Sequence, residues 1–321
     1  MVFLRSQHVR FFQRCLKVLP CAFAMLDDIR RVCQPHLSSF AVRMTIAYFA
    51  VSGLDLLNEL DQIEDRKIII EWIYSLQVLP DSKGRNVHRC GFRGSQANGC
   101  CSGDSNSASS AHTFDSGHIA MTYTALLTLV ILGDDLSRVD KAAVLHGLKS
   151  LQQREGGFSA LIDGSEDDMR FVYCASAICY MLRDWSGMDV DNTLRFIRNC
   201  YCYDGAFAPY PGLESHGGST FCAVASLSLM GKLDSVLTER QLNQLRRWCL
   251  FRQQSGFQGR PNKPIDTCYS FWVGAALELL GAFEFVDCRR NLEFLDTTQA
   301  PFTGGFSKWP DSDPGMRHRC L

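Results

Sequence analysis

The sequence predicts an all-α fold in which pairs of helices repeat about every 50 residues. Three observations support this prediction. A Gly-aromatic element recurs at an almost constant spacing, each copy is followed by an apolar and then an amphipathic helical segment, and no convincing run of alternating residues indicates strands. The recurring phenylalanines are Phe158, Phe207, Phe257 and Phe306, which lie 49, 50 and 49 residues apart. An earlier copy at Phe92 opens a longer first repeat.

The first helix of each repeat is predicted to be apolar on all sides, and the second to be amphipathic. The segments RFVYCASAICYML, STFCAVASLSLMG and TCYSFWVGAALELLG are rich in Ala, Ser, Cys and Gly, which suits a crowded inner position. In TERQLNQLRRWCLFRQQ, Thr238 and Gln241 form a capping box ahead of regularly spaced leucines. The segment SRVDKAAVLHGLKSLQQ repeats this design with Ser137 at its start. Two helices per repeat can form an open solenoid or a closed ring.

We interpret residues 1–321 as a single domain of such repeats. Residues 96–111, QANGCCSGDSNSASSA, are poor in apolar side chains and are expected to form a flexible loop. Residues 29–42 contain a proline and carry no repeat pattern, so we treat them as an insertion that the sequence does not place.

Composition excludes several classes of protein. A hydrophobic fraction of 46% can supply a sizeable core, and a formal net charge of −1 argues against nucleic-acid binding and a polybasic membrane anchor. No apolar run is long enough for a transmembrane span, and the N-terminal segment does not read as a signal peptide. The 15 cysteines are scattered without a CxxC pair, which indicates reduced thiols of a cytoplasmic protein.

Polar and reactive residues recur at one position of the repeats, in the loop that leads into the apolar helix. In a ring or solenoid these loops gather at one rim, so their residues are candidates for a shared site. The residues at this position are Arg170, His216, Arg260, Lys263, Asp266, Cys268 and His318.

Three of these residues could form a zinc site. Catalytic zinc takes mixed nitrogen, sulfur and oxygen ligands and keeps one position open, and Asp266, Cys268 and His318 supply such a set. Cys268 lies 11 residues after Phe257 and His318 lies 12 after Phe306, so neighbouring repeats would present both at the same height. The alternative interpretation is a buried thiol, a helix-capping carboxylate and an unrelated histidine.

A second group indicates an anion site. His216 precedes two glycines at the start of an apolar helix, where backbone N–H groups favour a phosphate. Arg260 can hold phosphate oxygens in a bidentate manner, and Lys263 adds a point charge. With Tyr269 these residues favour a diphosphate. The alternative is a set of ordinary solvated loop residues and a plain His-Gly-Gly turn.

Aromatic residues on the apolar helices could line a cavity for a long apolar ligand. Each of them could equally be an ordinary core residue. They are Tyr173, Phe221, Phe271 and Trp272.

Four long segments carry a family resemblance: GRPNKPIDTCYSFWVGA, ESHGGSTFC, DDMRFVYCAS and DSGHIAMTYTALLTLVILGDDLSRV. They resemble the β subunits of protein geranylgeranyltransferase type I, and the match covers most of residues 43–318. The resemblance implies an α/α toroid that forms a heterodimer with a helical α subunit. It also implies a cytoplasmic enzyme that moves a geranylgeranyl group from geranylgeranyl diphosphate to the cysteine of a C-terminal CaaX sequence, as in small GTPases.

The resemblance also implies roles for individual residues. Asp266, Cys268 and His318 match the ligands of one zinc ion per chain. The diphosphate contacts match His216, Arg260, Lys263 and Tyr269, and the positions at the cavity mouth match Arg170 and Tyr173, with Trp272 inside the cavity.

Two further positions distinguish members of the wider family. Thr45 and Phe49 match the place where the isoprenoid ends, and a small Thr45 leaves room for a twenty-carbon chain. Lys308 stands where farnesylating relatives carry a magnesium-binding Asp, so magnesium is not expected to be required. The resemblance therefore implies catalytic roles for Lys308, Tyr269 and Arg170.

The sequence also departs from the family pattern. It ends three residues after His318, so we expect the last repeat to be incomplete. An inactive variant that only binds the α subunit is therefore an alternative to an active enzyme. Farnesyl and Rab-type β subunits are further alternatives, against which Lys308 and Thr45 argue.

Overall fold

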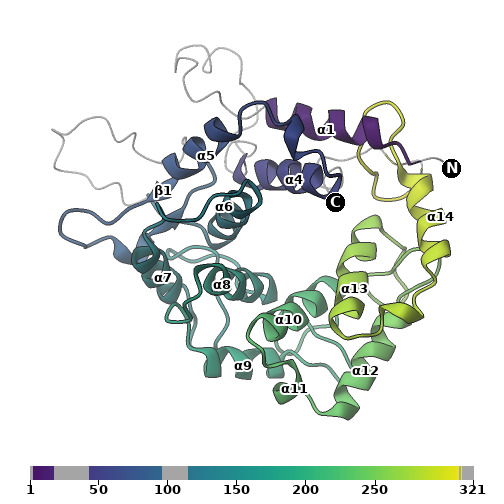
Figure 1. Cartoon of the computed structure of the whole chain (residues 1–321). Coiled ribbons are helices and arrows are strands. Elements are labelled where there is room, and N and C mark those ends of the chain that lie inside the picture. The colour runs from purple at the N-terminus through teal and green to yellow at the C-terminus, as the bar shows by residue number, and fades with distance from the viewer. Residues whose placement is uncertain (1–2, 18–42, 96–114, 311, 313–321) are drawn as a thin grey trace. The chain divides into compact units, whose positions relative to one another are not determined.

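The computed structural model describes residues 3–17, 43–95, 115–310 and 312, and the regular secondary structure of these residues is almost entirely helical (Figure 1). The predicted insertion at 29–42 and the predicted loop at 96–111 lie outside these residues, as does His318. The chain divides into two compact blocks. The N-terminal block contains Val9–Leu151 and Ala160–Ser165, and the C-terminal block contains Met1–His8, Gln152–Ser159 and Glu166–Leu321.

The N-terminal block is built from helices around a very short antiparallel ribbon. Strands β1 (Gln77–Val78) and β2 (Gly91–Phe92) pair with Gln77 opposite Phe92. Helix α4 packs against α6, and α7 packs beside the ribbon. The helices are α1 (Arg5–Lys17, whose first residues belong to the other block), α4 (Arg43–Leu56), η1 (Leu60–Gln62), α5 (Arg66–Ser75), η2 (Val87–Arg89), α6 (Ile119–Ile131) and α7 (Lys141–Ser150).

The C-terminal block contains two rows of helices. Helix α10 packs against both α8 and α13, and the amphipathic helices α9, α12 and α14 lie behind them in a second row (Figure 1). The first row is α8 (Met169–Leu182), α10 (Gly217–Leu229) and α13 (Thr267–Leu279). The remaining helices are α9 (Val190–Asn199), α11 (Leu233–Val236), α12 (Glu239–Leu250), η4 (Phe283–Phe285) and α14 (Cys288–Thr298).

Each Gly-aromatic element is a turn closed by an antiparallel bridge, so the predicted repeat is confirmed. The phenylalanine of each turn pairs with a residue just after the preceding helix, and the first four are fully buried. The pairs are Gln77–Phe92, Gln152–Phe158, Tyr201–Phe207, Gln253–Phe257 and Gln299–Phe306.

The helix starts confirm one prediction and correct another. Helix α12 begins with the predicted capping box of Thr238 and Gln241. Ser137 does not start α7, whose N-cap is Asp140, with Oδ1 accepting from Ala143 N at 3.0 Å. Ser137 N instead donates to Asp135 Oδ1 at 2.9 Å, which holds this residue in the preceding turn.

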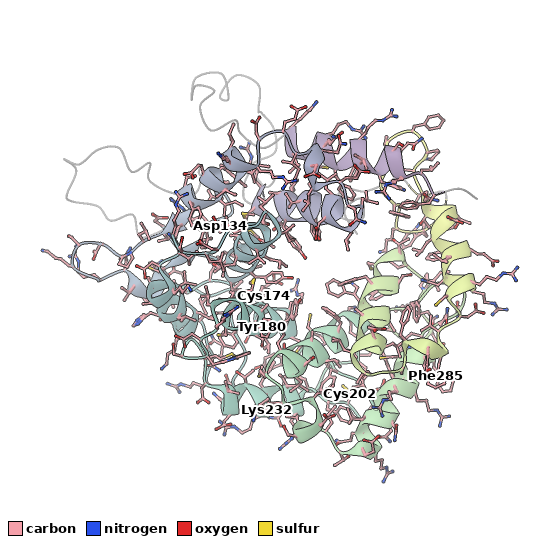
Figure 2. The ribbon with its side chains drawn as sticks, viewed as in Figure 1. Asp134, Cys174, Tyr180, Cys202, Lys232 and Phe285 are labelled. Carbon is pink, nitrogen blue, oxygen red and sulfur yellow. The ribbon has the colours of Figure 1, made fainter. Side chains whose placement is uncertain are left out.

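The cysteines that the structure describes are thiols without disulfide bonds, as the sequence predicts. Many lie inside the helix packing, such as Cys174 on α8, whereas Cys202 is half-buried in the loop before α10 (Figure 2). Burial raises the pKa of Cys174 to about 12, so this thiol stays protonated and inert. None of the described helices has the length and apolar character needed to cross a membrane.

Candidate active site

The helices that carry the candidate residues begin in the same way. The N-cap side chain accepts the backbone N–H two residues further on, which satisfies one of the unpaired donors at a helix start. In the C-terminal block the caps are Asp168 on α8, His216 on α10 and Asp266 on α13. The alternative interpretation of Asp266 as a helix cap is therefore correct, and it leaves the second carboxylate oxygen available.

His216 forms a pair with Tyr269. Its Nδ1 accepts from Gly218 N at 3.1 Å and Ser219 N at 3.4 Å, so its proton lies on Nε2 and is donated to Tyr269 Oη, 2.9 Å away. Burial lowers the pKa of His216, and Arg260 lowers it further, so the ring is neutral. The phenol accepts this bond and keeps its own O–H free to donate to a ligand.

This pair corrects one step of the sequence interpretation. The N–H groups of Gly218 and Ser219 were expected to favour a phosphate, but the His216 ring already accepts them. Any anion at this end of α10 would therefore meet the Tyr269 hydroxyl instead of the backbone.

Glycine makes room for the tyrosine. A Cβ at Gly259 would lie 2.0 Å from Tyr269 Cζ, which no real side chain tolerates. Gly217 N donates to Gly259 O at 2.8 Å and fixes the loop against the start of α10. Gly259 is thus required by close approach, a reason that the sequence alone did not reveal.

The basic loop residues differ in how they are held. Arg260 Nη1 lies 2.9 Å from Glu214 Oε2 in a solvent-exposed ion pair. Lys263 is exposed, and no described carboxylate forms an ion pair with it. Gln258 Nε2 donates to Lys263 O at 2.6 Å, which stabilises the loop from within.

Asp266, Cys268 and Lys308 lie together at the start of α13. Asp266 Oδ1 accepts from Cys268 N at 3.1 Å, and Lys308 Nζ is 3.5 Å from Asp266 Oδ2. Thr267 N donates to Lys308 O at 3.1 Å, so the backbone also holds the lysine in place. Burial raises the pKa of the Cys268 thiol, and the charge of Asp266 raises it further.

The donor set fits a zinc ion in part. A thiol sulfur and a carboxylate oxygen are both zinc ligands, and Asp266 and Cys268 lie two residues apart with Asp266 Oδ1 accepting from Cys268 N. Among the described residues no group of three His, Cys, Asp or Glu side chains is placed to hold a metal. His318, the predicted third ligand, lies outside them.

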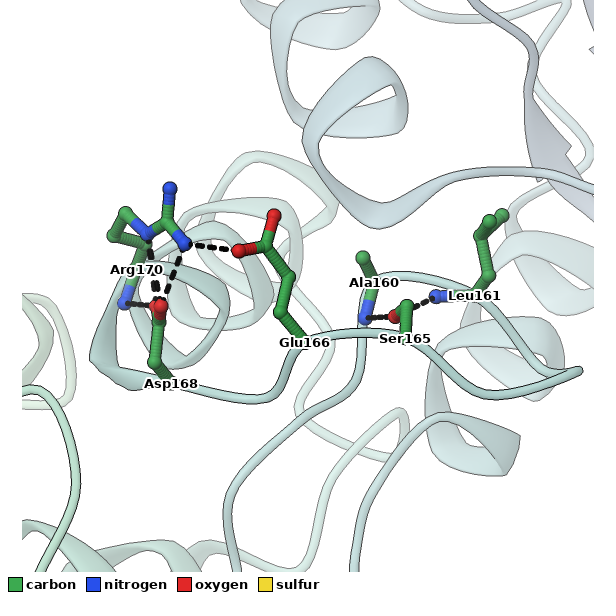
Figure 3. A network of polar contacts seen from close by, with 6 residues as sticks. All are labelled: Ala160, Leu161, Ser165, Glu166, Asp168 and Arg170. Carbon is green, nitrogen blue, oxygen red and sulfur yellow. Dashed lines mark hydrogen bonds and ion pairs between the residues drawn. The ribbon is translucent and has the colours of Figure 1, made fainter.

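Arg170 is already neutralised by two carboxylates. It binds Asp168, with Nη2 2.6 Å from Oδ2, and Glu166, with Nη2 2.8 Å from Oε2 (Figure 3). The bonds to Asp168, and then those to Glu166, raise the pKa of the guanidinium above its ordinary value. Any substrate contact by Arg170 would therefore compete with these two acceptors.

The predicted aromatic residues of α8, α10 and α13 form one cluster. Phe221 packs edge-on to Tyr173 at 5.3 Å between ring centroids, and against Phe271 at 5.2 Å and Trp272 at 5.3 Å. Phe271 is 50% exposed although it lies in an apolar helix. The cluster therefore presents an apolar surface and is not a closed core.

Thr45 and Phe49 lie on α4 in the N-terminal block. Thr45 Oγ1 lies 3.5 Å from Met121 Sδ, and Phe49 packs against Tyr48 with ring centroids 5.3 Å apart. Both side chains are half-buried.

Sequence reasoning missed the acidic partners of the predicted cations. Glu166, Asp168 and Glu214 each precede an apolar helix by only a few residues. The acidic residues beside Arg170 in EDDMR were an available signal for its ion pairs, whereas Glu214 and Arg260 lie 46 residues apart and share no local motif.

Comparison with known proteins defines the class first. Residues 3–321 match the prenyltransferase alpha-alpha toroid domain, which confirms the predicted α/α toroid fold. A solved structure, Candida albicans protein geranylgeranyltransferase-I complexed with GGPP, shares the fold. Its TM-score is 0.79 with 24% sequence identity, covering 100% of this chain and 89% of that one.

Two relatives are more specific. The geranylgeranyl transferase type-1 subunit beta of Arabidopsis thaliana is 41% identical over 287 residues, covering 86% of this chain and 75% of the relative. The same subunit of Dictyostelium discoideum is 37% identical over 326 residues, covering 97% and 87%. The chain therefore belongs to the family of geranylgeranyl transferase type-1 beta subunits, which are subunits of prenyltransferase enzymes.

Proposed function

We propose that this chain transfers a geranylgeranyl group from geranylgeranyl diphosphate to the cysteine of a C-terminal CaaX sequence, on proteins such as small GTPases. It does so in a heterodimer with a prenyltransferase α subunit. The observation that carries the proposal is the position of Tyr269, which follows Cys268 at the start of α13 and whose Oη lies 2.9 Å from His216 Nε2 at the start of α10. The residues that could bind a metal are thus close to the residues that could bind an anion. The two groups can therefore act together on the CaaX cysteine and the diphosphate of the donor.

The leaving diphosphate would be bound by neutral and cationic donors. Tyr269, fixed by His216, points a free O–H outward, while Arg260 and Lys263 add positive charge at the same loop. Lys308 brings a further ammonium group. Donors placed in advance stabilise charge as it develops on the departing oxygens, which is commonly the largest contribution to such a reaction.

Asp266, Cys268 and His318 would hold zinc. Bound zinc would keep the substrate thiol as thiolate at neutral pH. The thiolate sulfur forms a bond to C1 of the isoprenoid while the C1–oxygen bond breaks, and the electron pair leaves with the diphosphate. Lys308 stands beside Asp266 and would compensate charge without magnesium.

The aromatic cluster around Phe221 would bind the apolar chain of the donor, since exposed aromatic surface favours a lipid over water. Thr45 and Phe49 would contact the end of that chain, and the small Thr45 would admit the twenty-carbon donor. The free thiols of the described cysteines support a cytoplasmic location.

The deciding experiment measures transfer to a CaaX peptide by the chain coexpressed with a prenyltransferase α subunit, together with zinc content. Cys268→Ala is expected to lose most of the zinc and the transfer activity. Cys288→Ala removes an exposed thiol on α14 and is expected to retain both. Full zinc occupancy in Cys268→Ala, or no transfer by the unaltered heterodimer, would contradict the proposal.

The role of Lys308 can be tested separately. Lys308→Asp is expected to create a magnesium requirement, because a carboxylate beside the diphosphate can recruit the metal. Lys308→Gln is the matched control and is expected to be slow with or without magnesium. If the rate of Lys308→Asp ignores magnesium, Lys308 does not act at the leaving group.

A further inference from the structure

A cavity of about 370 Å³ lies at the C-terminal half of α12. Figure 1 shows α12 in the second row of the C-terminal block. Such a volume is near the lower end of the range for small-molecule sites. None of the residues assigned above to the candidate active site lines it. The lining residues are Asp204, Gln244, Arg247, Trp248, Phe251, Arg252 and Pro261.

Arg252 has a buried donor without a partner. Its Nη1 makes no hydrogen bond within the described part of the chain, although its Nε donates to Trp248 O at 3.3 Å. Its guanidinium carbon lies 4.8 Å from the centroid of the Trp248 ring. A buried charged donor that is left unpaired destabilises a protein, so the guanidinium of Arg252 retains hydrogen-bonding capacity that the described residues do not use.

The acidic residue of the cavity forms no ion pair with Arg252 in the described part of the chain, although its charge partly opposes the lowering of the Arg252 pKa by burial. Asp204 Oδ2 accepts from Trp248 Nε1 at 2.9 Å, and Oδ1 accepts from Ser215 Oγ. Both carboxylate oxygens are thus engaged elsewhere. Burial lowers the pKa of Arg252, whereas carboxylate partners raise that of Arg89 and Arg170.

A second guanidinium and an exposed ring complete the cavity. The guanidinium carbon of Arg247 lies 5.0 Å from the centroid of the Phe251 ring, and no described carboxylate forms an ion pair with Arg247. Phe251 is 61% exposed, whereas Trp248 is 5% exposed. The site thus combines two cations with one accessible aromatic face.

We propose that this cavity binds a small anion, a phosphate or a carboxylate, that carries a flat aromatic group. The anion accepts from the guanidinium groups of Arg252 and Arg247, which both line the cavity, and the aromatic group lies against Phe251. Guanidinium groups suit both anions because they donate in a planar fork, and aromatic rings attract flat apolar groups. This proposal does not depend on the prenyl-transfer reaction.

The test is isothermal titration of the chain, in the assembly in which it is isolated, with phenyl phosphate, inorganic phosphate, benzoate and phenol. Phenyl phosphate and benzoate are expected to bind at one saturable site, inorganic phosphate more weakly, and phenol not at all. Arg252→Met is expected to weaken binding of phenyl phosphate at least tenfold. Arg240→Met removes an arginine of α12 that does not line the cavity. This control variant is expected to bind phenyl phosphate as tightly as the unaltered chain.

Three further readouts separate this site from others. Phe251→Ala should abolish the advantage of phenyl phosphate over inorganic phosphate. Arg252→Met should keep prenyl transfer, since Arg252 is not among the residues of the candidate active site. The proposal is overturned if phenyl phosphate shows no saturable binding, if Arg252→Met binds it as tightly as the unaltered chain, or if geranylgeranyl diphosphate displaces it competitively.

Discussion

The Gly-aromatic turns inside the C-terminal block differ from the last one in what covers them. At the interior turns of Phe158 and Phe257, a glutamine binds the start of the next second-row helix. Gln152 Oε1 accepts from Asp189 N at 2.7 Å, and its Nε2 donates to Asp189 O at 3.0 Å. Gln253 makes the same two bonds to Asp287, at 3.0 and 2.8 Å. Helices α9 and α14 are thus each positioned by the glutamine of an earlier turn.

At the last turn the N-terminal residues of the chain take this role. Gln299 Oε1 accepts from Leu4 N at 2.9 Å, a residue 295 positions away. His8 is 2% exposed, its ring stacks on Phe306 at 4.7 Å, and its Nδ1 accepts from Gly305 N at 2.9 Å. The turn therefore requires a backbone N–H for its glutamine and a group that fills the space over its glycines. A segment far away in sequence can supply both.

The largest loss in the free energy of unfolding is expected from a substitution at an interior turn. A Cβ at Gly156 would lie 2.1 Å from the backbone oxygen of Asn192, and the residue has φ +98°, which side chains rarely adopt. Gly156→Ala is expected to lower the free energy of unfolding by about 3 kcal/mol, from strain and overpacking together. Denaturant titration measures this loss.

A matched control separates the two causes. Gly164 has a similar φ of +92° with nothing within 4 Å of its Cβ position. Gly164→Ala should therefore lower the free energy of unfolding by only about 1 kcal/mol, from strain alone. Equal losses in both variants would show that helix α9 does not close onto the turn.

A smaller effect is expected at the last turn. His8→Ala removes the acceptor of Gly305 N and the ring stacked on Phe306, so a buried donor loses its partner. We expect the free energy of unfolding to fall by about 2 kcal/mol. His146→Ala, at an exposed position of α7, is the control and should change it by less than about 0.5 kcal/mol.

The repeat and the start of α12 were predictable because their causes are local. The spacing of the phenylalanines and the Thr238 capping box depend on residues close together in sequence. The start of α7 was not predictable in the same way, because both Ser137 and Asp140 are good N-caps. Gln77 Oε1 accepts from Asp140 N at 3.1 Å, across 63 residues, and this distant contact favours Asp140.

In the candidate site, too, features with local causes were predictable from the sequence and features set by distant contacts were not. Residue types and motifs identified His216, Tyr269, Asp266 and Cys268, and the structure places them at the starts of α10 and α13. The proton arrangement of the His216–Tyr269 pair was not predictable, because it follows from which ring nitrogen faces the helix amides. The role of His8 was also not predictable, since its partners lie almost 300 residues away.

The glutamines give a direct comparison of the two kinds of turn. Gln253→Ala and Gln299→Ala each remove the acceptor of a helix-start N–H, so each should lower the free energy of unfolding by about 1 kcal/mol. In Gln299→Ala, His8 also loses the acceptor of its Nε2 proton. The double variant Gln299→Ala with His8→Ala should therefore lose less than the sum of the single losses. Strict additivity would mean that Gln299 and His8 act independently.

The smallest change in the free energy of unfolding is expected from a change of pH. Protonation of His8 leaves the shape of its ring and its stacking on Phe306 in place. Burial lowers the pKa of His8 below its ordinary 6.5, although the bond to Gln299 opposes this shift. The unfolded chain then binds more protons than the folded one as pH falls through about 6.5, so the folded state loses stability on acidification. The neutral ring is required because Nδ1 must keep a lone pair for Gly305 N.

His8→Phe isolates this contribution, since it keeps an aromatic ring over Phe306 but cannot titrate. Denaturant titrations between about pH 7.5 and about pH 5.5 should show a smaller loss of stability in His8→Phe than in the unaltered chain. His216, whose pKa is also lowered by burial, titrates in both proteins and cancels in the difference. An identical pH dependence in the two proteins would show that His8 is not neutral in the folded state, and that the last turn is held by Gln299 without it.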